Sequence, residues 1–517
     1  VIKAVKGKIH LVGASEVSIS LNGNSLVELI VKKGVLDALV ENKGTVYAKG
    51  GEIYLTTNAV DELLKGVVNN TGIVEAQSFG DVLGKIELFA HGGKVKVEGT
   101  LKAENGFIET SGKEFTISDA AVIKAKQWVI DPVDITIEST GAADLSGSSI
   151  KASFIESVLN AGTGVTLSAT NNINVNENIS WTDALFTLDA SNDININALM
   201  SASGTAGLTM NGNVIVGFNS GEATGFKGRI DLGIADIIIN GNTYKVLTSL
   251  GAQGSTTSGD LQGMAGSLSS NYVLGNNIDA SATSAWNSDG SGGFYGFDPI
   301  GYDWSNHFTG NFNGLGHEIS NLYINRSTEN NIGLFGWANS QTISNIGLIN
   351  NIITGNNNVA GLAGIMNGSL LNSYATGTVT GLNDTIGGLI GSFQGDMSNN
   401  YTNSLLTGIN KVGGLFGYSY ASTISNSYSL GKVTGEDNVG GLAGHALTTN
   451  ITDAHAKGEV SGKNKVGGLA GQLNGEILNS YATGKVTGLE DATGGLVGKL
   501  DGYGSTPSIK IVMQQVR

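Results

Sequence analysis

The sequence predicts an all-β protein with the architecture of a parallel β-helix, in which each coil of short strands stacks on the next. Three observations support this fold class: a repeat of about 27 residues, alternating apolar and polar residues in the N-terminal part, and 78 Gly against 3 Pro in 517 residues. Gly permits tight corners with positive φ, and Pro is scarce where nearly every backbone N–H donates to a neighbouring coil. The hydrophobic content of 40% and the charged content of 14% argue against a disordered chain.

The repeat is a Gly-Leu-x-Gly core that occurs seven times, with successive spacings of 28, 27, 26, 27, 27 and 27 residues. Between the cores lie extended pieces punctuated by Gly, without helical periodicity, so we interpret one repeat as one coil with three short strands. A propeller blade would need a repeat of roughly 40 residues or more. The cores begin at Gly333, Gly361, Gly388, Gly414, Gly441, Gly468 and Gly495.

A ring-bearing side chain recurs at one position of five successive repeats. The alternate positions carry small residues such as Ser373, Ala375 and Ala456. Because the side chains of a strand alternate between its two faces, we expect the rings to point outward as an exposed column beside a column of Asn and Asp. The rings could stabilise adjacent coils or form a binding strip. The candidate binding residues in this column are Tyr374, Tyr401, Tyr428, His455 and Tyr481.

The chain is predicted to consist of four parts. Residues 1–230 contain alternating segments such as Gly51–Leu55 and are interpreted as a β-helix with irregular coils. Residues 231–310, rich in Ser, Gly and aromatic residues and without a clear period, are expected to form a connecting β segment with extruded loops. Residues 311–500 hold the regular repeat, and residues 501–517 form a tail or a truncated coil.

An aromatic stretch within the connecting segment supplies two further candidate binding residues, Trp286 and Trp304. Asp289, Asp298 and Asp303 lie in the same Gly-rich stretch. Aromatic faces stack on sugars and carboxylates bind Ca²⁺, so this stretch could be a carbohydrate-binding loop or a weak calcium site. It could equally be a hydrophobic cap over the side of the β-helix.

Charge and composition exclude several classes of protein. Residues 131–517 carry the entire net charge of −15, because residues 1–130 hold 15 Lys and 15 acidic residues. An acidic surface without basic stripes makes nucleic-acid binding improbable. Cys is absent, which excludes disulfides and thiolate metal sites, and no apolar stretch approaches the roughly 18 residues of a membrane-spanning helix. The start at Val1 leads us to expect a mature or internal piece of a longer chain.

The sequence contains no catalytic signature that we recognise. There is no G-x-S-x-G elbow, and no Gly-Lys pair is followed by Ser or Thr. The His317-Glu318 pair has Asn321 where the second His of a zinc-binding H-E-x-x-H motif would stand. We therefore expect a protein that is not an enzyme and that needs no metal or other cofactor.

The repeat resembles a known bacterial motif. Gly-Leu-x-Gly cores followed by Asn-Ser-Tyr-Ala-Thr-Gly-x-Val-x-Gly, as at 479–488, are similar to the GLUG motif of bacterial surface proteins. Tyr244–Gly251, Phe107–Gly112 and Trp128–Pro132 resemble segments of filamentous-haemagglutinin-type exoproteins. This resemblance implies a right-handed β-helix, secretion through an outer-membrane transporter by a two-partner route in a Gram-negative bacterium, and a secreted or cell-surface location.

The relatives implied by this resemblance act mostly as adhesins, so the expected function is a non-catalytic stalk and binding surface for a host receptor, a neighbouring cell or a glycan. Two alternatives remain open at this point. The chain could be a component of an extracellular matrix or filament, with lateral self-association of its faces. It could also be a polysaccharide-active enzyme built on a β-helix.

Overall fold

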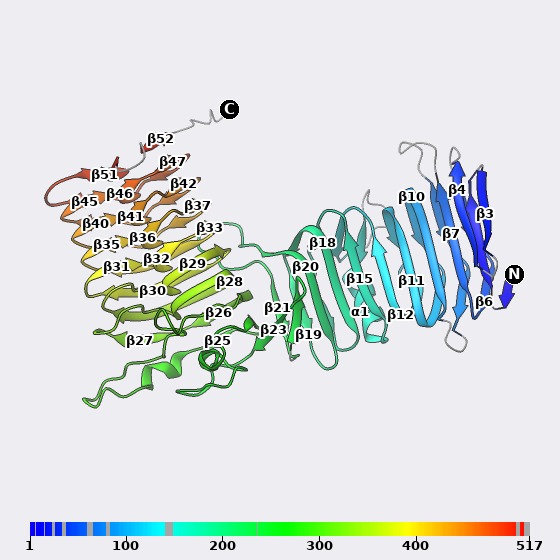
Figure 1. The fold of residues 1–517 in the computed structure, drawn as a ribbon, viewed down its shortest axis with the longest axis horizontal. Coiled ribbons are helices and arrows are strands. Elements are labelled where there is room, and N and C mark those ends of the chain that lie inside the picture. Colours follow the sequence, from blue (N-terminus) through cyan, green and yellow to red (C-terminus); the bar gives the residue numbers. More distant parts are fainter. Residues whose placement is uncertain are drawn as a thin grey trace. The chain divides into compact units, whose positions relative to one another are not determined.

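The computed structural model describes residues 1–5, 7–14, 16–22, 26–33, 38–58, 66–78, 83–139, 148–234, 236–502 and 507–510 (Figure 1). The chain divides into two compact units. Unit 1 comprises Val1–Gly217 and Gly228–Thr243, and unit 2 comprises Phe218–Lys227 and Tyr244–Arg517. Most of the predicted tail, residues 501–517, lies outside the described residues.

Unit 1 consists of strands that pair in parallel with their counterparts in the next coil. Strands β3 and β4 differ from these, because they form an antiparallel pair. The strands of unit 1 are β1 Ile2–Val5, β2 Lys8–Gly13, β3 Glu16–Asn22, β4 Leu26–Lys33, β5 Leu39–Asn42, β6 Thr45–Lys49, β7 Glu52–Asn58, β8 Val67–Asn70, β9 Ile73–Gln77, β10 Lys85–Val97, β11 Thr100–Ile117, β12 Val122–Asp131, β13 Ile135–Glu138, β14 Ser149–Lys151, β15 Gly164–Ala169, β16 Ile173–Val175, β17 Ile179–Trp181, β18 Leu185–Ile196, β19 Leu199–Ala202, β20 Gly207–Val216, β21 Arg229–Leu232 and β22 Asp236–Ile239.

The interior of unit 1 is built from apolar side chains stacked in register. One such row follows the pairing of β7, β10, β11, β12, β15, β18 and β20, and every member of it is buried. Its members are Ile53, Ile86, Ile108, Trp128, Val165, Phe186 and Leu208. The alternation predicted from the sequence is thus confirmed for these strands.

One element of unit 1 was not expected. Helix α1, Ala152–Asn160, interrupts the strands and buries Ile155, Val158 and Leu159 on one face. This spacing of three and four residues is the helical pattern, but it extends over too few turns to stand out in the sequence. None of the described residues forms a helix with the length and apolar content that crossing a membrane requires.

Unit 2 also consists of parallel strands, with two short 3-10 helices near its beginning, η1 Gln262–Gly266 and η2 Ser281–Ala285. Its strands are β23 Asn242–Leu247, which starts at the boundary, β24 Asn271–Leu274, β25 Ile278–Asp279, β26 Phe312–Ser320, β27 Tyr323–Arg326, β28 Phe335–Gly355, β29 Ala363–Leu371, β30 Tyr374–Gly381, β31 Asp384–Gly387, β32 Ile390–Gln394, β33 Asp396–Ser398, β34 Tyr401–Thr407, β35 Asn410–Gly413, β36 Phe416–Tyr420, β37 Thr423–Ser425, β38 Tyr428–Ser429, β39 Val433–Thr434, β40 Asp437–Gly440, β41 Ala443–Leu447, β42 Asn450–Thr452, β43 His455–Ala456, β44 Val460–Gly462, β45 Asn464–Gly467, β46 Ala470–Asn474, β47 Glu476–Leu478, β48 Tyr481–Ala482, β49 Val486–Gly488, β50 Thr493–Gly494, β51 Val497–Leu500 and β52 Ser508–Lys510.

The repeats from β35 to β49 each contain five short strands, and the repeat from β31 to β34 contains four, rather than the three that we expected. The repeat from β40 to β44 pairs strand by strand with the repeat from β45 to β49, in parallel. The prediction of three strands was wrong because the Gly-punctuated segments are divided into shorter strands. The all-β class and the long parallel sheets are as predicted.

The glycines of the Gly-Leu-x-Gly cores have a different role from the expected one. They do not adopt positive φ, whereas the corners use residues such as Asn399 (φ 57°) and Asp453 (φ 51°). A Cβ built at Gly441 would lie 2.2 Å from the carbonyl oxygen of Gly468 in the next repeat. Gly is therefore required because the backbones of adjacent coils approach closely. The Leu of each of the first six cores is buried inside, whereas Leu496 of the last core is partly buried; the buried ones are Leu334, Leu362, Leu389, Leu415, Leu442 and Leu469.

Candidate functional site

The predicted ring column exists in unit 2. The rings of Tyr374 and Tyr401 stack with their centroids 4.7 Å apart and their planes 6° apart. The stack continues through Tyr428, His455 and Tyr481 with centroid separations of 5.1, 4.8 and 4.9 Å. These separations follow from the strand pairing, because neighbouring strands lie about 4.8 Å apart.

The inside positions next to the column are also as predicted. Ser373, Ala375 and Ala456 are buried in the interior of the repeats. The Asn and Asp residues beside the column, Asn426 and Asp453 among them, occupy left-handed corners. Asn and Asp tolerate this conformation better than most residues, which gives their recurrence a local structural reason.

The column is not exposed along its length, contrary to our expectation. Residues Phe218–Lys227, which belong to unit 2, lie over its first members. Phe218 contacts Tyr401 with ring centroids 5.1 Å apart, and Phe226 contacts Tyr374 at 5.3 Å. Tyr374 and Tyr401 are consequently 3% and 1% exposed, whereas Tyr481 at the other end is 46% exposed. We call residues 218–227 the covering segment.

Backbone groups of the covering segment bind the hydroxyls of the column. The N–H of Gly225 donates to the hydroxyl of Tyr401 over 3.2 Å, and the N–H of Ala223 donates to that of Tyr428 over the same distance. The hydroxyl of Tyr374 donates to the carboxylate of Glu318. Burial raises the pKa of Tyr374 and of Tyr401, so both phenols stay protonated.

A charged cluster forms around Glu222, in the middle of the covering segment. The Glu222 carboxylate accepts a hydrogen bond from the Lys457 ammonium and lies 3.2 Å from Nε2 of His455. The hydrogen bond from Lys457 holds the pKa of Glu222 below its ordinary value. Burial lowers the pKa of His455, although the nearby Glu222 opposes this shift. Three of the predicted column residues, Tyr374, Tyr401 and Tyr428, together with His455, thus have partners within the chain.

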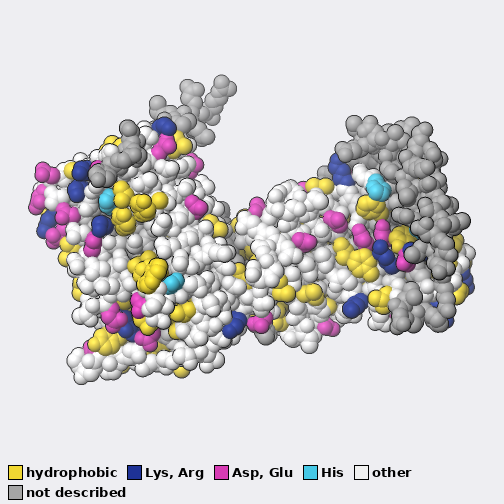
Figure 2. Space-filling view, in the orientation of Figure 1, with side chains coloured by type: hydrophobic (Ala, Val, Ile, Leu, Met, Phe, Trp, Pro, Cys, Tyr) yellow, Lys and Arg dark blue, Asp and Glu magenta, His cyan; other side chains and the backbone are white. Residues whose placement is uncertain are grey.

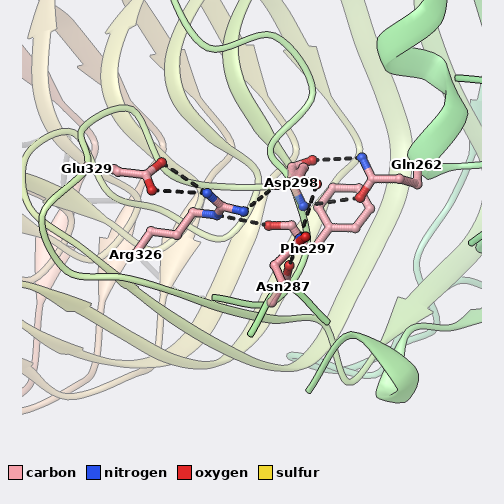
Figure 3. A network of polar contacts seen from close by, with 7 residues as sticks. Gln262, Asn287, Phe297, Asp298, Arg326 and Glu329 are labelled. Atoms are coloured by element: carbon pink, nitrogen blue, oxygen red, sulfur yellow. Dashed lines mark hydrogen bonds and ion pairs between the residues drawn. The ribbon is translucent and has the colours of Figure 1, made fainter. Parts of the chain in front are cut away.

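Trp286 packs inward. Its ring stacks on that of buried Phe297 with centroids 6.4 Å apart, and it borders the apolar core of unit 2. For this tryptophan the structure matches the hydrophobic cap among the alternatives. A polar network fixes the same segment from outside, and Figure 3 shows its centre: the Asp298 carboxylate accepts hydrogen bonds from Arg326 and Asn287.

The three carboxylates that could have formed a calcium site are engaged separately. Asp289 accepts N–H groups of its own turn, from Ser291 and Gly293, while Asp298 contacts Arg326. Asp303 caps a turn of its own. Within the described ranges, no three His, Asp or Glu side chains gather closely enough to hold a metal ion.

Trp304 points into solvent with 74% of its surface exposed. Its indole lies 6.2 Å from that of Trp337, at an interplanar angle of 65°, and 6.1 Å from the His307 ring. His307 in turn lies 6.2 Å from Trp337. The Nδ1 of His307 is 2.7 Å from the carbonyl oxygen of Trp304. Since a carbonyl only accepts, Nδ1 carries a proton and donates it. We call Trp304, His307 and Trp337 the tryptophan corner.

A second aromatic group lies on a later strand of the same sheet. Tyr418 and Tyr420 project from β36, and Tyr420 is 48% exposed. The Tyr418 ring contacts His445 at 5.5 Å, and the Lys411 ammonium lies 5.5 Å from its centroid. We call Tyr418 and Tyr420 the tyrosine pair. Figure 2 shows two separate groups of hydrophobic side chains, each beside a histidine, on the drawn face of the part that includes β28 to β46.

Sequence reasoning named Trp304 but missed the residues around it. Trp337 and Tyr418 each follow directly on a Gly-Leu-x-Gly core, and the register pairs this position from one repeat to the next. An alignment of the position after each core would have revealed this outward column. The His317-Glu318 pair is not part of it: His317 is buried beside Asn277.

Comparisons with known proteins agree with the repeat. The family model of the GLUG motif matches residues 435–461 and 464–487. Halomucin of Haloquadratum walsbyi is 47% identical over 113 residues, which are 21% of this chain and 1% of halomucin, so the chain spans only a very small part of that relative. A solved structure of a proposed immunoglobulin A1 protease from Bacteroides ovatus covers 52% of this chain and 84% of its own, with 16% identity and a TM-score of 0.38. The chain is thus a repeat protein that carries GLUG motifs.

Proposed function

We propose that the protein is a secreted or cell-surface adhesin whose stacked repeats act as a non-catalytic stalk and binding surface. The observation that carries this proposal is the exposure of aromatic side chains on unit 2, above all Trp304, whose loop packs against Trp337 of β28. Contiguous exposed apolar patches with polar residues around them mark interaction sites. The GLUG repeats and the likeness to halomucin support a location outside the cell.

The finer features of this proposal rest on the resemblance to filamentous-haemagglutinin-type exoproteins. They are a right-handed coil of about 27 residues, export through an outer-membrane transporter, and contact with a host receptor, a neighbouring cell or a glycan. Repetition suits such contact, because several weak sites on one rigid body increase the overall affinity. The proposed role requires no cofactor and no catalytic group.

The test is binding of the fluorescently labelled chain to panels of bacterial and animal cells, measured by flow cytometry. We expect saturable binding that persists at raised salt, because non-specific electrostatic contacts of a chain with net charge −15 would be screened. The heat-unfolded chain is the control and should not bind. Absence of binding to every cell type, or release of peptides or sugar ends from the cells, would contradict the proposal.

A further inference from the structure

The tryptophan corner and the tyrosine pair belong to one outward sheet face. Trp337 pairs in register with Ile365, Ile365 with Ser392, and Ser392 with Tyr418, on the successive strands β28, β29, β32 and β36. Three strand spacings separate Trp337 from Tyr418, which places the two aromatic groups about 14 Å apart along the stacking direction. This distance is too long for one sugar ring or one small side chain to reach both groups.

The surface between the two aromatic groups carries polar side chains and one apolar side chain, the partly exposed Ile365. Asn367 pairs with Gln394 in the column next to Trp337, and Ser392 lies beside them. Gln394 is exposed and the other two are partly exposed. Amide and hydroxyl groups both donate and accept hydrogen bonds, so this stretch matches a ligand with many hydroxyls better than it matches an apolar protein surface, whose contact region would be continuous.

The tryptophan corner itself is shaped for a flat ring with one apolar face. The planes of Trp304 and Trp337 meet at 65°, so they form two walls of a corner rather than a stacked pair. Asp303 holds the turn in place by accepting the N–H groups of Ser305 and Asn306 over 2.8 and 2.9 Å. Nδ1 of His307 donates to the Trp304 carbonyl, so Nε2 is the ring nitrogen that remains for a hydroxyl of a ligand.

The charges around the tryptophan corner favour an uncharged ligand. No Lys or Arg occurs between residues 246 and 325. Arg326 is engaged by Asp298 and Glu329, and Lys411, near the tyrosine pair, is paired with Asp384 over 2.9 Å. Lys465 lies near His445, beside the tyrosine pair. A sulfated or carboxylated sugar would therefore gain little charge stabilisation in the tryptophan corner, where Arg326 already has acidic partners.

We propose that this face binds an uncharged oligosaccharide that lies along the stacking direction, with one sugar ring in the tryptophan corner and another on the tyrosine pair. The inference rests on the proposed function, since it names the ligand class of the same surface. The pyranose ring presents C–H groups to the aromatic faces, and its hydroxyls reach the amides of Asn367 and Gln394 in between.

The experiment uses the full chain on an array of neutral, sulfated and carboxylated oligosaccharides, followed by calorimetric titration with the neutral ligand that binds best, in short and long forms. We expect binding to neutral sugars that strengthens with chain length. Trp304→Ala should weaken binding of both short and long forms about tenfold, ~1.4 kcal/mol, and Trp304→Phe should retain most of it. Trp304 is largely exposed, so neither variant should unfold.

A double variant tests the extended pose. Tyr418→Ala with Tyr420→Ala should weaken the long form about tenfold and leave the short form unchanged, because only the long ligand reaches both groups. Tyr481→Ala is the matched control, since Tyr481 is exposed to nearly the same degree as Tyr420 but lies in the other column. It should change neither affinity.

Three results would overturn the inference. The first is that the chain binds no neutral sugar, and the second is that Trp304→Ala binds the sugar as tightly as the wild type does. The third is a concentration-dependent self-association that Trp304→Ala abolishes, because a second copy of the chain would then be the occupant of this face. These results are distinguishable from failure of the proposed function. If Trp304→Ala binds cells as well as the wild type does, adhesion stands and this face is not its site. If the wild type binds oligosaccharides but no cells, the proposal that this face binds sugars is supported and the proposed adhesin role is contradicted.

Discussion

Unit 2 carries two aromatic surfaces that arise from the same repeats but differ in their exposure to solvent. The ring column from Tyr374 to Tyr481 is covered at one end by residues 218–227, whereas the tryptophan corner and the tyrosine pair face solvent. Both surfaces follow from alternation along strands that are paired in register. The difference between them arises from a segment outside the repeat, so position in a repeat determines which way a side chain points but not whether water reaches it.

The two surfaces also differ in how their rings meet. In the column, consecutive rings are nearly parallel and 4.7 to 5.1 Å apart, so each ring fills the space above its neighbour. In the tryptophan corner the indoles meet edge to face at 65°, and Trp304 keeps 74% of its surface exposed. Both geometries are favourable contacts between aromatic rings, so the exposure of Trp304, and not the angle, leaves surface for a ligand.

The largest expected effect is a difference in the free energy of unfolding between substitutions in the covered part of the ring column and at its exposed end. Tyr401→Ala removes a ring packed between Tyr374, Tyr428 and Phe218, and should lower the free energy of unfolding by about 4 kcal/mol, as for other buried aromatic residues. Tyr481→Ala, at the exposed end, should cost less than about 1 kcal/mol. Urea denaturation measures both. Equal losses would show that the covering segment contributes nothing to the column.

The next effect tests the scaffold that both surfaces share. Gly441→Ala places a methyl group 2.2 Å from the Gly468 carbonyl oxygen and 2.7 Å from the Ala456 Cβ, so it should destabilise unit 2 by about 3 kcal/mol. Gly495 is the equivalent glycine of the last core and has nothing within 4 Å, which makes Gly495→Ala the matched control. The control should unfold like the wild type. A stable Gly441→Ala protein would refute close approach as the reason for the regular recurrence of these glycines.

The sequence could predict those parts of the site that depend on residues close together in the chain or one repeat apart, but not those that depend on distant residues. Alternation and a steady repeat act locally, so the stacking of Tyr374 on Tyr401 and the burial of Ser373 were predictable. The contact of Ala223 with Tyr428 joins residues 205 positions apart, and no repeat or motif links them. Nothing local in the sequence distinguishes a column that will be covered from one that will not.

The glycines and the second face illustrate two other limits. Composition predicted that glycine was needed in unit 2, but close approach between coils and positive φ at corners both favour glycine, and only coordinates separate the two reasons. Trp337 was within reach of sequence reasoning, because its position after a core is itself periodic. It was missed because the residues at that position are chemically dissimilar.

A smaller effect distinguishes the two tryptophans that the sequence placed in one candidate site. Trp286 is half-buried on Phe297 and the core, so Trp286→Ala should lower the free energy of unfolding by about 2 kcal/mol, less than for a fully buried ring. Trp304→Ala should change it by no more than about 0.5 kcal/mol. Thermal unfolding of the two variants side by side gives the comparison. If Trp304→Ala were the more damaging, the tryptophan corner would be a packing element and not an open surface.

The smallest effect is the pH dependence of the covered end of the column. Burial holds the pKa of His455 below 6.5, with Lys457 acting in the same direction and Glu222 against it. The unfolded chain therefore binds more protons than the folded one as the pH falls below about 6.5. Stability should decline over that range, and should level off once the pH is below the folded-state pKa. Glu222 has a lowered pKa, so its own contribution is lost only at more acidic pH.

Urea midpoints of the wild type and of His455→Gln across this range measure the decline, which should be shallower in the variant. Half-buried His445, whose pKa is also lowered by burial and by Lys411 and Lys465, acts in the same direction, so adding His445→Gln to the His455→Gln variant should make the decline shallower still. A wild-type chain that became more stable on acidification would require a protonated His455 paired with Glu222. The covering segment would then be held by an ion pair at acidic pH, and the contrast between the two surfaces would depend on pH rather than on packing.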